Sequence, residues 1–428
     1  MLPAGPAQGR ARRLKLLFLL PFAPDLRGSH GGARATAAMI EMLSREHSVR
    51  GVYIHTAGER PPRQPPNCEQ LIAVPLHRSR VTSRSVLRRV VDAFARLAWR
   101  QPWWVEECRS PALASKIAEI ARQFEPDIVQ FEFHVMAQYI PIVRSAQPNA
   151  KCVVTEHEPG ISADARAGAA RPLAKRLGAL VRRRAWSRYE SRALRRADGI
   201  VAFTAADAAT LRRLLGPRGP AIAVIPLRLP QSATRPVTSP RIASDFLFVG
   251  NFGHPPNVDA ALRLVGSIFP RILHQLPNAM LAIVGADPPR ELLEAASDRV
   301  TVTGWVDDPK PYLNGARLVL VPLRQGGGLR VKMLEACAAG KAIIASPTAV
   351  EGLGLVPDQS FVLADSDQEF AQAAVQLFGD SARRSRLGKA ARRWSAEAQD
   401  QDAWGAEYAA LYDVLDRSRT HAAAARPR

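Results

Sequence analysis

Three consecutive glycines, Gly326, Gly327 and Gly328, stand where an apolar run gives way to a helical pattern. Glycine at such a junction lets backbone N–H groups approach an anion closely, and the N-terminus of the following helix favours negative charge. Arg330 and Lys332 fall in the first helical turn, where a cation opposes the helix dipole unless an anion lies nearby. This spacing therefore predicts a site for a phosphate-bearing ligand.

Glu335 lies one turn after Lys332, near the same helix face. A carboxylate there can accept hydrogen bonds from sugar hydroxyls, and Gly340 then ends the helix. The pattern is neither a Walker A loop nor the dinucleotide fingerprint, because the lysine lies inside the helix and no serine or threonine follows it. The alternative is a tight turn with solvated charges, but the added arginine, lysine and glutamate favour a ligand site.

Three histidines follow apolar runs that we expect to be strands. His157 ends one run, the segment Glu132, Phe133, His134 ends another, and His254 follows the first strand of the second half. Ligands of doubly wound sheets bind at the carboxyl ends of strands, so these side chains are candidates for a binding cleft. The alternative for each histidine is a packed or surface position without a role.

The elements that would position these residues alternate along the whole chain. Continuous apolar runs between helical patterns indicate parallel sheets covered on both faces. Expected helices include 33–45, 112–124 and 173–195. The expected strands are 14–22, 49–55, 71–76, 128–133, 152–157, 199–204 and 222–227, then 246–250, 280–285, 300–304, 318–322, 342–346 and 361–364.

A proline-, serine- and threonine-rich segment without apolar periodicity interrupts this alternation and predicts an interdomain linker. The chain of 428 residues is long enough for two or three domains. The last part reads as helical, with an Ala/Arg-rich end. The expected divisions are an N-terminal domain at 1–228, a linker at 229–244, a C-terminal domain at 245–400, a helix at 401–420 that could pack back on the N-terminal domain, and a disordered tail at 421–428.

The composition and the length of the apolar runs indicate where in the cell the protein would be located. The four cysteines show no metal-ligand or redox spacing, which indicates a reducing compartment and predicts a cytoplasmic protein. No apolar run reaches the roughly 18–20 residues that a membrane span needs, and the short run at 16–20 is better explained as a buried first strand than as a secretory signal.

A net charge of +20 indicates an anionic partner. Seven arginines occur from Arg78 to Arg100, followed by Trp103 and Trp104, and ten Arg or Lys residues occur from Arg171 to Arg196. Basic faces with tryptophans suit an anionic membrane surface, and solvated helix faces are the alternative. No nucleic-acid recognition motif accompanies the charge, so we expect no nucleic-acid partner.

Several segments, taken in order, resemble the GT-B glycosyltransferases, specifically the large retaining family 4 (group 1) type. FLFVGNFGHPPNVDAALRLV, residues 246–265, resembles the family's V-G turn and helix, and 321–346 resembles its V-P-L, G-G-G, K-x-L-E-A, G-K and I-I-A-S series. The resemblance implies an α/β architecture of two Rossmann-like doubly wound domains facing a cleft. Further matching segments are 281–285, 300–306, 350–352, 21–22, 31–32, 155–157 and 197–204.

The resemblance also implies roles. The N-terminal domain would be the acceptor side and the C-terminal domain would bind a nucleotide-sugar, with the ribose on Glu335 and the diphosphate or sugar on the glycine loop. His157, Arg330 and Lys332 would be catalytic, and Glu132 and His134 are acceptor-side candidates. The donor-binding set would be Gly31, Gly32, Asn251, His254, Trp305, Val306, Gly326, Gly327, Gly328, Leu329 and Glu335.

Three departures from the family pattern stand out. The family's first glutamate, eight positions before Glu335, is replaced by Gly327. Its Arg and Lys after the first strand of the C-terminal domain are absent from 251–257, and its P-N-G reads Pro226, Leu227, Arg228. We therefore expect Arg330 and Lys332 to neutralise the diphosphate.

The expected activity is a retaining, metal-independent hexosyl transfer from a nucleoside-diphosphate sugar to a glycan or lipid-linked acceptor, as in polysaccharide or cell-envelope glycan biosynthesis. Protein cations would replace a metal ion, and no cofactor is expected besides the co-substrate. A cytoplasmic site peripheral to the inner face of the membrane would suit such acceptors. The alternatives are a GT-B-like sugar-nucleotide epimerase and a non-catalytic scaffold, which the missing glutamate favours.

Overall fold

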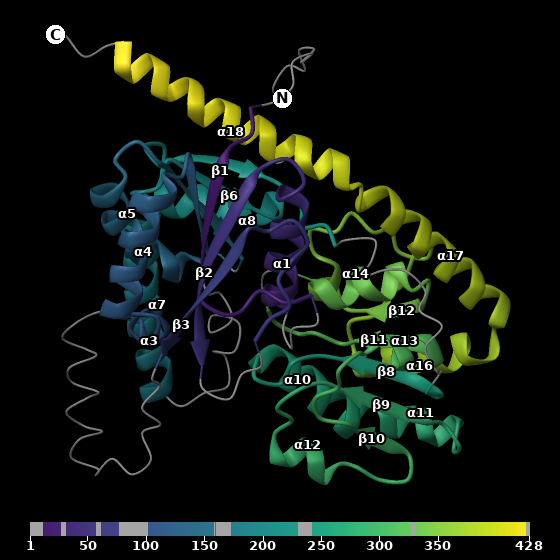
Figure 1. The fold of residues 1–428 in the computed structure, drawn as a ribbon. Helices are drawn as coiled ribbons and strands as arrows, with labels where there is room; N and C mark the ends of the chain where they lie inside the picture. The colour runs from purple at the N-terminus through teal and green to yellow at the C-terminus, as the bar shows by residue number, and fades with distance from the viewer. Residues whose placement is uncertain are drawn as a thin grey trace.

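The computed structural model describes residues 12–26, 31–56, 61–76, 102–157, 159, 173–229, 242–326 and 330–424. Two parallel sheets, each flanked by helices, form two domains that lie side by side (Figure 1). This arrangement confirms the predicted α/β class with two Rossmann-like domains.

The N-terminal sheet has seven strands in the order β3-β2-β1-β4-β5-β6-β7, all paired in parallel. The run KLLFLL of β1 is buried beyond its first residue, because helices cover both faces of the sheet. The strands are β1 (Lys15–Leu20), β2 (Ser48–Thr56), β3 (Gln70–Leu76), β4 (Ile128–Glu132), β5 (Lys151–Glu156), β6 (Gly199–Ala202) and β7 (Ala221–Val224).

The C-terminal sheet repeats this plan with six parallel strands in the order β10-β9-β8-β11-β12-β13. The glycines that end β8 and β9 touch, since a Cβ on Gly285 (φ +151°) would lie 1.7 Å from the carbonyl oxygen of Gly250. The strands are β8 (Ser244–Val249), β9 (Leu281–Val284), β10 (Val300–Val302), β11 (Ala316–Val321), β12 (Ala342–Ala345) and β13 (Val362–Leu363).

Helices connect these strands. Most expected elements are present, but the helix expected at 33–45 begins at Gly31, so the glycine pair forms its first residues rather than a preceding loop. The N-terminal helices are α1 (Gly31–Leu43), α3 (Trp103–Glu107), α4 (Pro111–Phe124), η1 (His134–Tyr139), α5 (Ile140–Ala146), α7 (Leu173–Leu194) and α8 (Ala205–Leu215). The C-terminal ones are α10 (Pro255–Arg263), η3 (Leu264–Ile268), α11 (Phe269–Gln275), α12 (Arg290–Glu294), α13 (Lys310–Gly315), α14 (Val331–Ala338), α15 (Pro347–Val350), α16 (Asp367–Gly379), α17 (Ser381–Ala398) and α18 (Gln401–Ala424).

The long helix α18 runs back along the N-terminal domain (Figure 1). Its aromatic residues Trp404, Tyr408 and Tyr412 are buried in a cluster that includes β1, and the Tyr412 hydroxyl donates to Gln130 Oε1 at 3.0 Å. The helix continues to Ala424, and residues 425–428 of the tail expected to be disordered lie outside the described residues. None of the described helices is long and apolar enough to cross a membrane.

Arg228 explains one departure from the family pattern. Its guanidinium donates to both carboxylate oxygens of Glu407 on α18, at 2.8 and 2.9 Å, and to the carbonyl oxygen of Ala398. The position that reads P-N-G in the family therefore fixes the C-terminal helix here. Arg228 is buried at the end of the N-terminal domain, where the chain leaves for the C-terminal one.

Candidate active site

Helices α1 and α14 meet between the two domains. A Cβ on Gly31 would lie 3.0 Å from Val331 Cγ2, so the first residue of α1 touches the first residue of α14. Each helix follows the carboxyl end of an inner strand of its sheet, β1 or β11, which is where doubly wound sheets bind ligands. The two expected halves of the donor site are thus side by side.

An ion pair joins these helices. Arg34 Nη1 donates to Glu335 Oε1 at 2.5 Å, and the two side chains are only 16% and 15% exposed. The second carboxylate oxygen of Glu335 is buried without a hydrogen-bond partner among the described residues. Arg34 is absent from the sequence-predicted set, although a cation in the first turn of a helix that begins with two glycines repeats the signal used for Arg330.

Lys332 lies close to this ion pair. Its ammonium donates to Asn257 Oδ1 at 2.5 Å and lies 4.6 Å from the centroid of the Phe248 ring. Burial, reinforced by the positive charges of Arg330 and Arg34, lowers the pKa of Lys332 to about 7. A nearby anion would favour the charged form, so this lysine can respond to a phosphate.

Arg330 caps the same helix. Its side chain is buried, and Nη2 donates to the carbonyl oxygen of Gly326 at 3.2 Å. The same Nη2 lies 3.7 Å from Glu351 Oε2. Gly326 has φ +128°, a conformation that favours glycine. The other predicted loop residues, Gly327, Gly328 and Leu329, lie outside the described residues.

The loop after β8 supports Lys332 indirectly. Asn257 Nδ2 donates to the carbonyl oxygen of Asn251, whose side chain accepts from the Gly253 amide, each at 2.7 Å. Asn251 therefore shapes the loop that holds Asn257 against the lysine. His254 precedes the first residue of α10.

Trp305 and Val306 follow β10, the edge strand two positions away from β8. Trp305 is 45% exposed, and Val306 packs against the core of the C-terminal domain. The structure thus places this predicted pair at one side of the sheet, whereas Glu335 and Lys332 lie on the helix after β11, one of the two central strands.

A histidine–glutamate pair lies at the carboxyl ends of β4 and β5. His157 Nε2 is 2.7 Å from Glu132 Oε2, and both side chains are buried. The imidazole stacks on Phe133, with ring centroids 3.8 Å apart, and its Nδ1 has no hydrogen-bond partner among the described residues. A Cβ on Gly32 would lie 2.9 Å from Phe133 Cζ, so glycine is needed for α1 to approach this pair.

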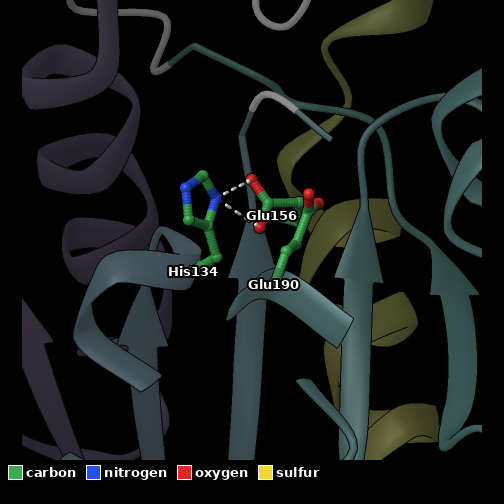
Figure 2. Close-up of side chains that lie close together, drawn as sticks. All are labelled: His134, Glu156 and Glu190. Atoms are coloured by element: carbon green, nitrogen blue, oxygen red, sulfur yellow. Dashed lines mark hydrogen bonds and ion pairs between the residues drawn. The ribbon is translucent and has the colours of Figure 1, made fainter. Parts of the chain in front are cut away.

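A second buried cluster surrounds His134. Its Nδ1 lies 2.9 Å from both carboxylate oxygens of Glu156, and Glu190 from α7 completes a group whose ligand atoms lie within 4.8 Å of one another (Figure 2). All three side chains are fully buried, and Trp104 and Trp186 pack edge-on against the imidazole. Histidine and carboxylates are the donor types that hold Zn²⁺. Glu156 and Glu190 were not predicted, because strand and helix bring them together only in the fold.

The basic segments are described in part. Residues from Arg78 to Arg100 lie outside the described residues, and from Arg171 to Arg196 side chains are described only from residue 184 onward. Trp104 is partly buried and packs edge-on against Phe133, with ring centroids 5.4 Å apart, against the core of the N-terminal domain. This corrects its expected role as an interfacial tryptophan, because its ring is already occupied by protein contacts.

Comparison with known proteins agrees with this geometry. Residues 30–228 match the model of the glycosyl transferase 4-like domain, and residues 243–380 match the model of the group 1 glycosyl transferases. No protein of curated function matches the chain.

Solved structures share the fold. Sucrose-phosphate synthase from Thermosynechococcus elongatus matches with a TM-score of 0.70 at 18% identity, over 94% of this chain and all of that one. Anabaena HepE in complex with UDP gives 0.61 at 13% identity, over 94% and 100%. A variant of S. aureus TarM, also with UDP, gives 0.63 at 10% identity, over 93% and 100%. At these identities the likeness shows the fold alone.

The two family models together span both domains, one over each sheet, and this confirms the resemblance noted in the sequence. The chain belongs to the group 1 glycosyltransferases of the family 4 type, with the GT-B fold.

Proposed function

We propose that this glycosyltransferase transfers a hexosyl group from a nucleoside-diphosphate sugar to a glycan or lipid-linked acceptor, with retention at the anomeric carbon, in polysaccharide or cell-envelope glycan biosynthesis. The observation that carries the proposal is the position of Glu335. One of its oxygens is buried without a partner among the described residues, and three cations, Arg34, Arg330 and Lys332, lie around it.

Glu335 would accept a hydrogen bond from a ribose hydroxyl of the donor. The diphosphate would then lie at the N-terminus of α14, beside Arg330 and Lys332 and against the loop at 326–329. Backbone N–H groups and the helix dipole favour an anion at such a terminus. UDP in the structures of HepE and TarM supports a nucleotide donor for this fold.

The difficult step is the departure of the diphosphate. The bond from the anomeric carbon to the phosphate oxygen breaks, a bond to the acceptor oxygen forms, and the acceptor proton leaves with the nucleoside diphosphate. Lys332 would become fully charged as the phosphates arrive and would stabilise the developing charge with Arg330. Because protein cations supply this charge, we propose that transfer is metal-independent and insensitive to EDTA.

His157 would face the donor sugar. An ionised Glu132 only accepts hydrogen bonds, so it would hold the proton on Nε2 and leave Nδ1 as an acceptor for a sugar hydroxyl. Stacking on Phe133 fixes the plane of the ring. Glu132 is then a positioning residue that acts through His157, rather than a group that contacts the acceptor.

Docking to an anionic membrane surface would bring the site to lipid-linked acceptors. The net charge of +20 and the arginine-rich segments support this peripheral, cytoplasmic-face location. Binding to anionic liposomes at low salt, lost at high salt, is the expected result. Absence of binding at low salt would contradict it.

A sugar-nucleotide epimerase is the second candidate, because acid/base residues gather at the ends of β4 and β5. There are two buried pairs, Glu132 with His157 and His134 with Glu156. Both lie at the carboxyl ends of the neighbouring strands β4 and β5. Such a reaction needs several proton donors and acceptors at one sugar. An epimerase would convert its donor without an acceptor, whereas a transferase would not.

A donor screen separates these functions. We expect one UDP-, GDP- or ADP-sugar to raise the melting temperature, since ligand binding stabilises the native state. The stabilising donor is then incubated with and without candidate acceptors, and products are identified by mass spectrometry and by NMR of the anomeric proton. Retention in a transferred product supports the proposal. An epimerised donor supports the second candidate, and failure of every donor to bind overturns both.

A further inference from the structure

Arg34 approaches the donor site from the opposite domain. It lies in the first turn of α1, and its Nη1 reaches Glu335 Oε1 across the domain interface. The Arg34 side chain is 16% exposed, and its Nε is buried without a hydrogen-bond partner among the described residues. The guanidinium therefore has donor capacity that the contact with Glu335 does not use.

Three cations lie near this contact, and the carboxylates around them are unevenly shared. Both Arg34 and Arg330 act on Lys332, and Glu335 is the carboxylate that acts on this lysine. Arg330 is also balanced by Glu351, which is 49% exposed, and by Asp207. Arg34 and Lys332 therefore share Glu335, and a phosphate beside them would be stabilised by both.

One loop of the C-terminal domain has no arginine or lysine that could bind a phosphate. The loop 251–257 contains no arginine or lysine, so it offers no such cation to a phosphate. Arg34 stands on α1, whose first residue packs on the first residue of α14, beside which the phosphates would lie. An arginine offers a planar fork of donors that fits phosphate oxygens in pairs.

We propose that Arg34 is a donor-binding residue that changes partner when the donor arrives. Without donor it pairs with Glu335; when the ribose occupies Glu335, Arg34 turns to the diphosphate and completes the missing phosphate contacts from the N-terminal domain. This inference rests on the proposed function. It follows that a nucleoside without phosphates must break the ion pair with nothing in return, and that Arg34 selects for the diphosphate.

The test compares affinities for a nucleoside diphosphate and for its nucleoside. UDP, GDP and ADP, with uridine, guanosine and adenosine, are titrated by calorimetry into the wild-type chain, Arg34→Gln and Arg290→Gln. Arg290 is the matched control, because it also pairs with a carboxylate, Glu294, but lies exposed on α12 of the C-terminal domain.

We expect Arg34→Gln to weaken diphosphate binding by about 10- to 100-fold, as for loss of a charge-assisted contact, while nucleoside binding is unchanged or stronger. Arg290→Gln should change neither. A merely structural ion pair would weaken both ligands by the same factor, and that result, or unchanged diphosphate binding, overturns the role of Arg34. Failure of the wild-type chain to bind any diphosphate overturns the proposed function as well.

Arg34→Lys keeps the inference testable where the glutamine variant fails to fold. Lysine retains the charge and the contact with Glu335 but lacks the fork, so we expect a smaller loss, about 3- to 10-fold, again confined to the diphosphate. An equal loss for nucleoside and diphosphate in this variant contradicts the change of partner.

Discussion

His157 Nε2 and Glu132 Oε2 lie 2.7 Å apart, at the carboxyl ends of the neighbouring strands β5 and β4. The imidazole also stacks on Phe133, which adopts φ +65° to follow the strand end. The ring is thereby fixed in plane by one neighbour and in tautomer by the other. This relationship gives the first prediction.

Glu132→Gln should lower kcat by roughly 10- to 100-fold, because an amide can donate as well as accept and no longer fixes the tautomer of His157. Affinity for the nucleoside diphosphate should stay within about twofold, since Glu132 lies on the N-terminal sheet. Steady-state kinetics and calorimetry measure both quantities. Glu119→Gln, on the exposed face of α4, is the control. Equal loss of kcat and nucleotide affinity would contradict a positioning role.

Lys332 should make donor affinity depend on pH. Its pKa of about 7 rises when phosphates arrive, so the chain takes up a proton on binding at pH 8, and affinity falls as pH increases from 7 to 9. Calorimetry in buffers of different ionisation enthalpy measures this uptake. The variant Lys332→Met should lose this proton uptake, although the charged groups that face the lysine, Arg34, Arg330 and Glu335, remain in place. The same uptake in both proteins would assign the proton to another group.

The same lysine should affect stability. Its pKa is depressed from 10.5 in the folded chain, so between about pH 7 and 10.5 the unfolded chain binds more protons. Its contribution therefore makes the free energy of unfolding rise with pH across that window. Lys332→Met should flatten this rise in denaturant titrations at several pH values. An unchanged slope would show that the pKa of Lys332 is not depressed in the folded chain.

Gly285→Ala should destabilise the C-terminal domain by about 3 kcal/mol or more, because its Cβ would fall 1.7 Å from the carbonyl oxygen of Gly250 at a φ that suits glycine. Gly266→Ala is the matched control. A Cβ there meets nothing within 4 Å, so we expect no loss and a gain of up to roughly 1 kcal/mol. Urea denaturation compares the two, and similar stabilities for both variants would contradict the close approach.

Tyr412→Phe tests whether α18 belongs to the N-terminal core. Removal of the hydroxyl leaves Gln130 Oε1 buried without this donor, which should cost about 1–3 kcal/mol. Tyr312→Phe, in a helix of the C-terminal domain, should be within about 0.5 kcal/mol of wild type. Equal unfolding midpoints for all three proteins would mean that α18 does not depend on this contact.

The fold could be predicted because buried parallel strands are continuous apolar runs. Errors occurred where polar residues extend a strand. β8 begins at Ser244 and β11 at Ala316, each two residues earlier than expected, because Asp245 and Arg317 take part through an ion pair at the sheet end. Such pairs join residues that are distant in sequence, so apolar periodicity does not reveal them.

The candidate site could be predicted only where its residues share one turn of helix. Arg330, Lys332 and Glu335 lie within six consecutive residues at the start of α14, so local spacing was enough. The Arg34–Glu335 pair joins residues 301 positions apart and depends on how the two domains dock. Glu156 was not predicted, although it precedes His157 in the sequence, because only the fold brings its carboxylate to His134.

The most direct test of the account is calorimetric titration of UDP, GDP and ADP into the wild-type chain and into Glu335→Ala. Glu294→Ala, an exposed ion-pair residue of α12 in the same domain, is the control. The account predicts that one nucleotide binds the wild type and the control alike, and that Glu335→Ala weakens it by about 10-fold or more, the loss of one buried hydrogen bond to a charged group. Equal affinity in all three proteins would remove Glu335 from the donor site and contradict the account.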